Sequence, residues 1–191
     1  MNKAEMVSNK FGDFENINRS YHEKSKKHVV GISLGGIYMT ENDEIITTVL
    51  GSCVSACVRD TLTGISGMNH FMLVGSKSDI DKASGHSLFQ YGLYSMDYLL
   101  NKMLYLGASK ETMEVKIFGG GAIISSAGDV GKKNIRFIKN YINLKGYKLC
   151  GEDIGGEHPR RVNFYSSTGK VMVKRMRSLH RQVIANKESN L

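Results

Sequence analysis

The sequence predicts a single α+β domain, organised as a β-rich sandwich flanked by two main helices. Several short runs rich in β-branched residues, each bounded by glycine or polar residues, indicate strands. Two further segments carry apolar residues at every third or fourth position, which is typical of amphipathic helices. The chain has 191 residues, of which 41% are hydrophobic, and this is enough for one domain with its own core.

The predicted strands are distributed along most of the chain. Residues 29–40 and 44–50 are strands by their β-branched composition, and residues 65–73 form another strand after a turn at residues 61–64. Residues 53–59 fit either a strand or a short helix, because the segment is too short for periodicity to decide. Further strands are expected at residues 114–118, 147–151, 161–165 and 170–174, the last two as a hairpin.

The two helices are expected between these strands. In the first, apolar residues recur on one face from Phe89 to Met103, and Gly107 occupies the position of a C-terminal glycine stop. The second helix covers residues 133–144, where isoleucines form one stripe. Residues 75–87, just before the first helix, are polar and predict a loop.

The two ends of the chain differ in composition from its middle. Residues 1–28 are polar without clear periodicity and predict a flexible leader, residues 29–175 predict the folded domain, and residues 176–191 predict a basic tail. Residues 159–191 carry eight Lys and Arg and one Glu, so most of the net charge of +8 lies there. Such a segment can contact nucleic acid, an anionic membrane surface or an acidic protein, or it can simply be solvated.

Composition also indicates in which compartment the protein is expected and which kinds of partner are not expected. No apolar run approaches the roughly 20 residues of a membrane helix, and the features of a secretory signal are missing. The 3 cysteines cannot all pair within the chain, which favours a reducing compartment. The basic tail lacks the interleaved aromatic residues of a single-strand binding platform. We therefore expect a cytoplasmic protein with no membrane insertion and no nucleic-acid partner.

Cys53 is the strongest candidate for a reactive residue. It follows a predicted strand and the Gly-Ser pair at residues 51–52, where glycine lets the backbone turn tightly and lets a substrate approach an exposed nucleophile. A thiol reacts as its thiolate, so it needs a partner that lowers its pKa. His70, in a neighbouring predicted strand, can supply an imidazole base. From these residues alone, an inert cysteine and a structural histidine are the more frequent interpretation of such a pair.

Other kinds of site fit the sequence less well. Cys53, Cys57 and His70 could bind zinc, but their spacing lacks the paired ligands of zinc sites. The glycines at residues 119–121 suggest a phosphate loop, but the Lys-Ser/Thr of a P-loop is missing, so a tight exit from a strand is expected. Cys57 and Cys150 are expected to be core residues. No metal and no cofactor are therefore predicted.

Several segments, in order along the chain, resemble the CheD family of chemoreceptor glutamine deamidases. Residues 47–57 (TTVLGSCVSAC) resemble the family's active-site segment, and residues 67–73 (GMNHFML) resemble its histidine segment at the usual distance. The resemblance continues at residues 91–92, 116–122, 131–134, 152–156, 160–162 and 168–171, so it covers about residues 29–175. Val74 and Ile123-Ile124 depart from the family pattern.

The resemblance implies a fold, a reaction and its residues. The fold is similar to the cysteine hydrolase domain of glutamine-deamidating toxins, and the substrates are glutamines on the methylation helices of chemotaxis receptors. Cys53 is the nucleophile, His70 the base and Thr47 a third site residue that holds the imidazole, while Thr48 points to the opposite face of its strand. Backbone groups near Gly51 and Ser52 support the oxyanion.

The family resemblance also implies partners. These are receptor cytoplasmic domains and a CheC-like phosphatase, which competes with the receptors. The alternative function is a non-enzymatic adaptor that binds such a phosphatase or a receptor without chemical conversion.

Overall fold

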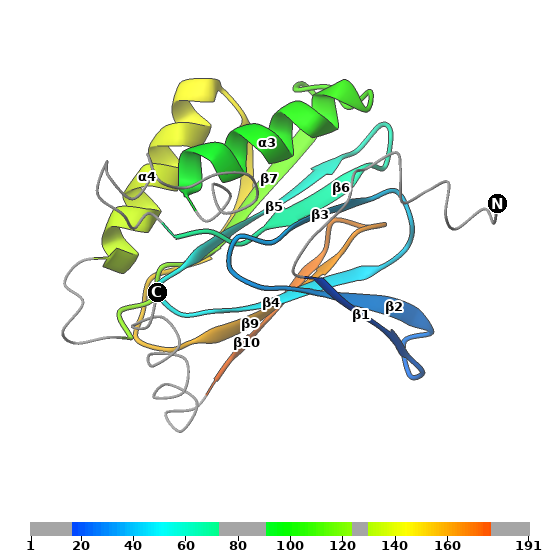
Figure 1. Cartoon of the computed structure of the whole chain (residues 1–191). Helices are drawn as coiled ribbons and strands as arrows, with labels where there is room; N and C mark the ends of the chain where they lie inside the picture. Colours follow the sequence, from blue (N-terminus) through cyan, green and yellow to red (C-terminus); the bar gives the residue numbers. More distant parts are fainter. Residues whose placement is uncertain (1–16, 73–90, 124–129, 177–191) are drawn as a thin grey trace.

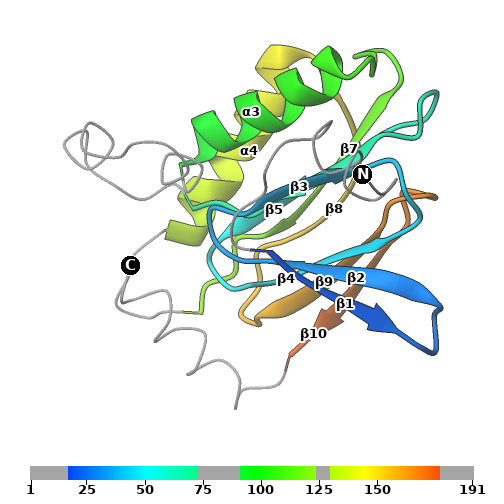
Figure 2. The ribbon, with the colours of Figure 1, turned by 45° about the vertical axis from the view of Figure 1, so that its right-hand side comes forward.

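The computed structural model describes residues 17–72, 91–123 and 130–176. Two β-sheets face each other, and two helices, α3 (Gly92–Tyr105) and α4 (Val130–Lys145), cover the outer face of one sheet (Figure 1). Figure 2 shows the same three layers from a second side. The predicted α+β class, a β-rich sandwich flanked by two helices, is confirmed.

The sheet away from the helices, which we call sheet A, has the strand order β1-β2-β4-β9-β10. Its strands are β1 (Ile17–His22), β2 (Lys27–Ile32), β4 (Ile45–Leu50), β9 (Arg160–Tyr165) and β10 (Val171–Arg175). All neighbouring pairs are antiparallel except β2 and β4, which run parallel. The chain leaves this sheet between β2 and β4 and returns to it.

The sheet under the helices, sheet B, has the strand order β3-β6-β5-β7-β8. Its strands are β3 (Ile37–Thr40), β6 (Ser66–Asn69), β5 (Val54–Asp60), β7 (Met113–Gly119) and β8 (Lys148–Ile154). The strands β7 and β8 run parallel because α4 connects them over the sheet face, as a βαβ crossover requires. The remaining pairs are antiparallel.

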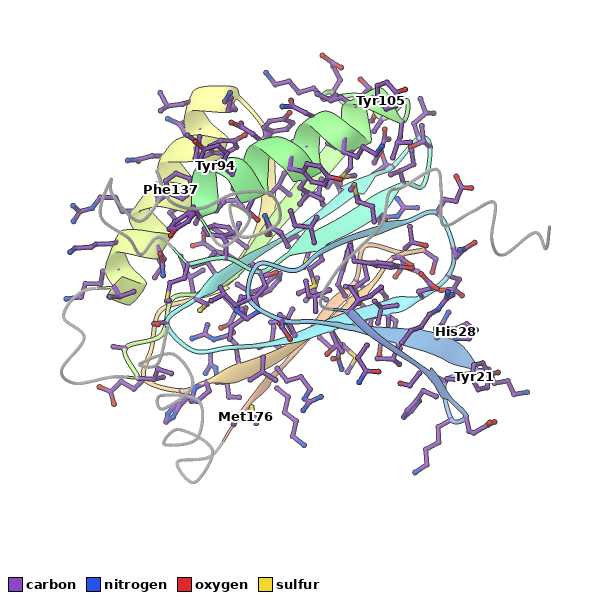
Figure 3. All side chains as sticks on the ribbon, in the orientation of Figure 1. Tyr21, His28, Tyr94, Tyr105, Phe137 and Met176 are labelled. Atoms are coloured by element: carbon purple, nitrogen blue, oxygen red, sulfur yellow. The ribbon has the colours of Figure 1, made fainter. Side chains whose placement is uncertain are left out.

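Two apolar clusters hold these layers together. One lies between sheet B and the helices and contains Leu99, Ile117 and Ile138. Phe137 of α4, labelled in Figure 3, meets Phe71 edge to face with ring centroids 5.9 Å apart. The second cluster, which we call the inter-sheet core, fills the space between the two sheets. Along β2, β4 and β9, residues of this cluster alternate with residues on the outer face of sheet A, which is the period-2 pattern of strands.

The strand β1 shows that the folded part begins earlier than predicted. It lies inside residues 1–28, which the sequence predicts to be a flexible leader, yet it pairs with β2 from Ile17↔Ile32 to His22↔Lys27. All of its side chains except Ile17 are exposed, so backbone hydrogen bonds rather than apolar burial hold it. A strand of this kind leaves no hydrophobic pattern in the sequence.

The remaining described elements agree with the prediction within a few residues, except for one predicted strand that is divided in two. The predicted strand at residues 29–40 is two strands, because a turn at residues 33–36 moves the chain from sheet A to sheet B. The open choice at residues 53–59 is resolved as the strand β5. The predicted loop at residues 75–87, Phe89 and most of the predicted tail lie outside the described residues. None of the described helices is long and apolar enough to cross a membrane.

Candidate active site

Cys53 lies on the turn that carries the chain from one sheet to the other. The strand β4 ends at Leu50 in sheet A, and β5 begins at Val54 in sheet B. Backbone hydrogen bonds fix this turn on both sides of Ser52, because Gly121 N–H donates to the Gly51 carbonyl and Gly120 N–H donates to the Cys53 carbonyl, both at 2.7 Å. The nucleophile candidate therefore sits on a rigid crossover.

The three glycines at residues 119–121 support this crossover. Gly119 has a φ of 108°, and a β-carbon there would lie 2.1 Å from the Cys53 carbonyl oxygen. No other residue type can bring the end of β7 so close to the nucleophile's backbone. The tight turn predicted at the end of this strand is confirmed, and it lets the end of β7 pack closely against the backbone of Cys53.

His70 follows β6 and faces the same space as Cys53. The neighbouring chain segments pair at Val54↔Phe71 and Cys57↔Met68, and this register places His70 opposite Ser55. Opposite residues of two strands share a face, and so do residues two positions apart in one strand. Cys53 and His70 therefore both point into the inter-sheet core, where Cys53 belongs to the buried cluster.

The site is buried, in contrast to the exposed nucleophile that the sequence predicts. The exposed fraction is 1% for Cys53 and 6% for His70. Burial lowers the pKa of His70 to about 4, because the charged imidazolium loses its hydration. The imidazole is therefore neutral over the physiological pH range and able to accept a proton.

Thr48, not Thr47, contacts the imidazole. Thr48 Oγ1 lies 2.8 Å from His70 Nδ1, whereas the Thr47 hydroxyl donates to Asn163 Oδ1 at 2.6 Å and lies 3.0 Å from the Val162 carbonyl. The two threonines do point to opposite faces, as expected, but Thr48 is on the face of the inter-sheet core. The expected contact between Thr47 and His70 is wrong.

The contacts of Thr48 define the tautomer of His70. The Thr48 hydroxyl has a single hydrogen, and it donates to the Ile32 carbonyl at 2.7 Å. Thr48 can therefore only accept from His70, so the proton of the neutral ring is on Nδ1. Nε2 is then the basic nitrogen, and it is buried without a hydrogen-bond partner in the described part of the chain.

Acid should destabilise the fold through His70. The unfolded imidazole, with an ordinary pKa near 6.5, takes up a proton that the folded ring, with a pKa of about 4, does not. Stability attributable to this group is present above pH 6.5 and is lost as the pH falls toward 4. We expect the wild type to lose about 2 to 3 kcal/mol more unfolding free energy than His70→Gln between pH 7 and 4.5. Urea unfolding of both proteins at pH 7 and at pH 4.5 measures these free energies. Equal losses in the two proteins would contradict the lowered pKa of His70.

The other two cysteines, Cys57 and Cys150, do not lie on the glycine turn. Cys57 lies in the inter-sheet core, where burial raises the pKa of its thiol, so the core role predicted for it is confirmed. Cys150 is only half-buried on β8, so its predicted core position is wrong. All three cysteines are free. No group of three His, Cys, Asp or Glu side chains that could hold a metal occurs in the described residues.

Cys53 on its glycine turn and the neutral imidazole of His70 therefore lie on one face of sheet B. Cysteine hydrolases use a thiol and an imidazole that come within hydrogen-bond reach of each other. Residues 72–175 match the family described as CheD chemotactic sensory transduction. The chain belongs to the CheD family.

Several curated relatives carry the name "Probable chemoreceptor glutamine deamidase CheD". The protein of Hahella chejuensis is 41% identical over 181 residues, which cover 93% of this chain and 84% of the relative. The protein of Hydrogenovibrio crunogenus is 44% identical over 155 residues, which cover 81% of each chain. The protein of Halorhodospira halophila is 36% identical over 192 residues, which cover 99% of this chain and 89% of the relative.

Proposed function

We propose that this protein deamidates glutamine side chains of chemotaxis receptors to glutamate, with Cys53 as nucleophile and His70 as base. The observation that carries the residue assignment is the buried Nε2 atom of His70, a basic nitrogen without a partner in the described structure. An unpaired buried polar atom costs stability, so its retention favours a role in chemistry. The names of the CheD relatives support the reaction and the receptor substrate.

The reaction follows from the protonation states of the two side chains. As Cys53 Sγ attacks the carboxamide carbon, its proton moves to His70 Nε2, and the carbonyl oxygen becomes an oxyanion near the backbone of Gly51 and Ser52. The imidazolium then protonates the departing nitrogen, and ammonia leaves behind a thioester. Water attacks the thioester, His70 again takes a proton, and the thiol leaves from a new carboxylate.

Burial adds a requirement for substrate entry. Cys53 is 1% exposed, so a glutamine side chain reaches its sulfur only after neighbouring groups move. The same burial keeps water from the thiol and keeps the imidazole neutral before the substrate binds. Receptor binding therefore supplies both the glutamine and the displacement that uncovers the nucleophile.

Thr48 acts in this scheme as a positioning residue for His70. Thr48→Val keeps the shape of the side chain but leaves Nδ1 without its acceptor, so the ring can turn and change tautomer. We expect kcat to fall about 10- to 100-fold with little change in KM. Thr47→Val is the matched control, since it removes the neighbouring hydroxyl, which contacts Val162 and Asn163. A larger loss in Thr47→Val than in Thr48→Val would restore Thr47 as the third residue of the site.

Release of ammonia tests the proposed function against the adaptor alternative. The full chain is incubated with a cytoplasmic fragment of a chemotaxis receptor that carries glutamines at its methylation sites. The proposal predicts ammonia in proportion to the glutamines converted, and none from a fragment with glutamate at those sites. Tight binding of the fragment without ammonia would favour the adaptor.

The family resemblance supports a CheC-like phosphatase as a second partner, and this extends the proposal to regulation. If the phosphatase competes with receptors for the protein, its addition should slow ammonia release and raise the apparent KM for the receptor fragment. An apparent KM for the receptor fragment that is unchanged at saturating phosphatase would contradict competition by this partner. A receptor cytoplasmic domain as substrate would place the reaction in the cytoplasm, and the three free cysteines are compatible with that compartment.

A further inference from the structure

Asn134 joins α4 to the turn that carries Cys53. It lies in the first part of α4, is completely buried, and its Nδ2 donates to the Ser52 carbonyl at 2.8 Å. A carbonyl oxygen can only accept, so the atom of Asn134 that faces it must be the amide nitrogen. This bond ties a buried side-chain amide of α4 to the backbone beside the nucleophile.

This contact completes the support of the nucleophile turn. The carbonyls of Gly51 and Cys53 accept backbone hydrogen bonds from Gly121 and Gly120, and the Ser52 carbonyl between them accepts from Asn134. All three successive carbonyls of the turn are therefore held from the side of β7 and α4. Asn134 supplies the only one of these three bonds that a side chain makes.

The held carbonyl sets the direction of the next amide group. The carbonyl of Ser52 and the N–H of Cys53 belong to one planar trans peptide, so they point in opposite directions. A bond that fixes the Ser52 carbonyl toward α4 fixes the Cys53 N–H away from α4. Because the Cys53 carbonyl is held as well, by Gly120 N–H, the peptides on both sides of Cys53 are fixed, and with them the Cα–Cβ direction that determines where the sulfur meets a substrate carbon.

The first turn of α4 is close to this segment for a separate reason. A β-carbon on Gly131 would lie 2.6 Å from the Gly120 carbonyl oxygen, and one on Gly120 would lie 2.4 Å from Ile135. In Figures 1 and 2 the first turn of α4 lies at the end of sheet B where β5 begins. The helix therefore presents Asn134 to the turn from a closely packed and rigid base.

We propose that Asn134 is a positioning residue for the deamidation, which orients the Ser52–Cys53 peptide so that the nucleophile and its backbone N–H meet the glutamine carboxamide in the reactive geometry. This inference rests on the proposed function of Cys53. It assigns to α4 a part in the reaction besides its packing on sheet B. Since the oxyanion forms only after attack, a misdirected peptide lowers kcat more than it raises KM.

The test compares three variants of the full chain with the wild type on the receptor fragment, with rates corrected for the folded fraction. Asn134→Ala removes the donor, and Asn134→Asp keeps the shape but replaces the donor with a carboxylate. Ile138→Ala is the matched control, because Ile138 lies one turn further along the buried face of α4 and belongs to the apolar cluster between sheet B and the helices. Its substitution weakens the helix packing by leaving a cavity.

We expect kcat to fall about 10- to 100-fold in Asn134→Ala, with KM within about twofold, and to stay near the wild-type value per folded molecule in Ile138→Ala. The ratio of Asn134→Asp activity to wild-type activity should rise as the pH falls from 8 to 6, because burial at this position raises the pKa of the carboxyl and its protonated form can donate to the Ser52 carbonyl. Wild-type kcat in Asn134→Ala, or an equal loss in Ile138→Ala, would overturn the inference. A wild type that releases no ammonia would instead refute the proposed function.

Discussion

Cys53→Ala should abolish deamidation of the receptor fragment while leaving the fold intact. The substitution removes the atom that forms the thioester, so we expect kcat to fall on the order of 10⁴-fold or more. Alanine is smaller than cysteine and fits the inter-sheet core, where Cys53 is 1% exposed. Ammonia release and thermal unfolding, measured on the same sample, separate loss of chemistry from loss of structure.

Cys57→Ala is the matched control for this substitution. Cys57 lies four positions further along the chain, is equally buried in the inter-sheet core and presents the same thiol. Its removal should lower stability by a similar amount and leave kcat per folded molecule unchanged. Activity that survives in Cys53→Ala and disappears in Cys57→Ala would move the nucleophile to the second cysteine.

His70→Ala should cause the second largest loss. The variant keeps the thiol but lacks the base that removes its proton and the acid that protonates ammonia, and such groups contribute about 10²- to 10⁴-fold. The substitution leaves a cavity of imidazole shape beside the Thr48 hydroxyl. Added imidazole should therefore restore part of the ammonia release, with a rate that rises with the imidazole concentration.

The rescue separates a chemical role of His70 from a structural one. A histidine needed only for folding would leave a variant whose unfolding temperature is low and whose activity imidazole does not restore. His28→Ala, which removes an exposed ring on β2, controls for general effects of losing a histidine and should keep the wild-type rate. Full activity of His70→Ala without imidazole would contradict its role as base.

The position of the candidate pair could be inferred from local pattern. The glycine turn before Cys53 marks where a new segment begins. The short turn at residues 61–64 predicts that the segments on its two sides are adjacent, and the structure pairs them as β5 and β6. The spacing then brings Cys53 and His70 to one face. Their burial could not be inferred, because it results from sheet A closing over that face, which is a contact between strands distant in sequence.

The choice between the two threonines shows why site details need the structure. Alternation places Thr47 and Thr48 on opposite faces of β4, and this expectation is correct. Both faces of β4 carry β-branched or leucine side chains, so the sequence does not indicate which face meets the second sheet. The packing of Ile46 and Leu50 in the inter-sheet core decides it in favour of Thr48.

Asn134 and β1 were missed for related reasons. A buried asparagine in a helix looks like any polar position of an amphipathic pattern until its backbone partner is known, and Ser52 is far from it in sequence. The strand β1 is polar and held by its backbone pairing with β2. In both cases the deciding interaction is a hydrogen bond to a main-chain group, which leaves no pattern in side-chain hydrophobicity.

Peptide mass mapping of the receptor fragment after incubation in ¹⁸O-labelled water tests hydrolysis by Cys53 most directly. Attack of labelled water on the thioester should leave each converted glutamine about 3 Da heavier, against about 1 Da in ordinary water, and Cys53→Ala should leave the masses unchanged. A fragment that binds the wild type and keeps its mass in both waters, or that gains the label equally with Cys53→Ala, would contradict the account.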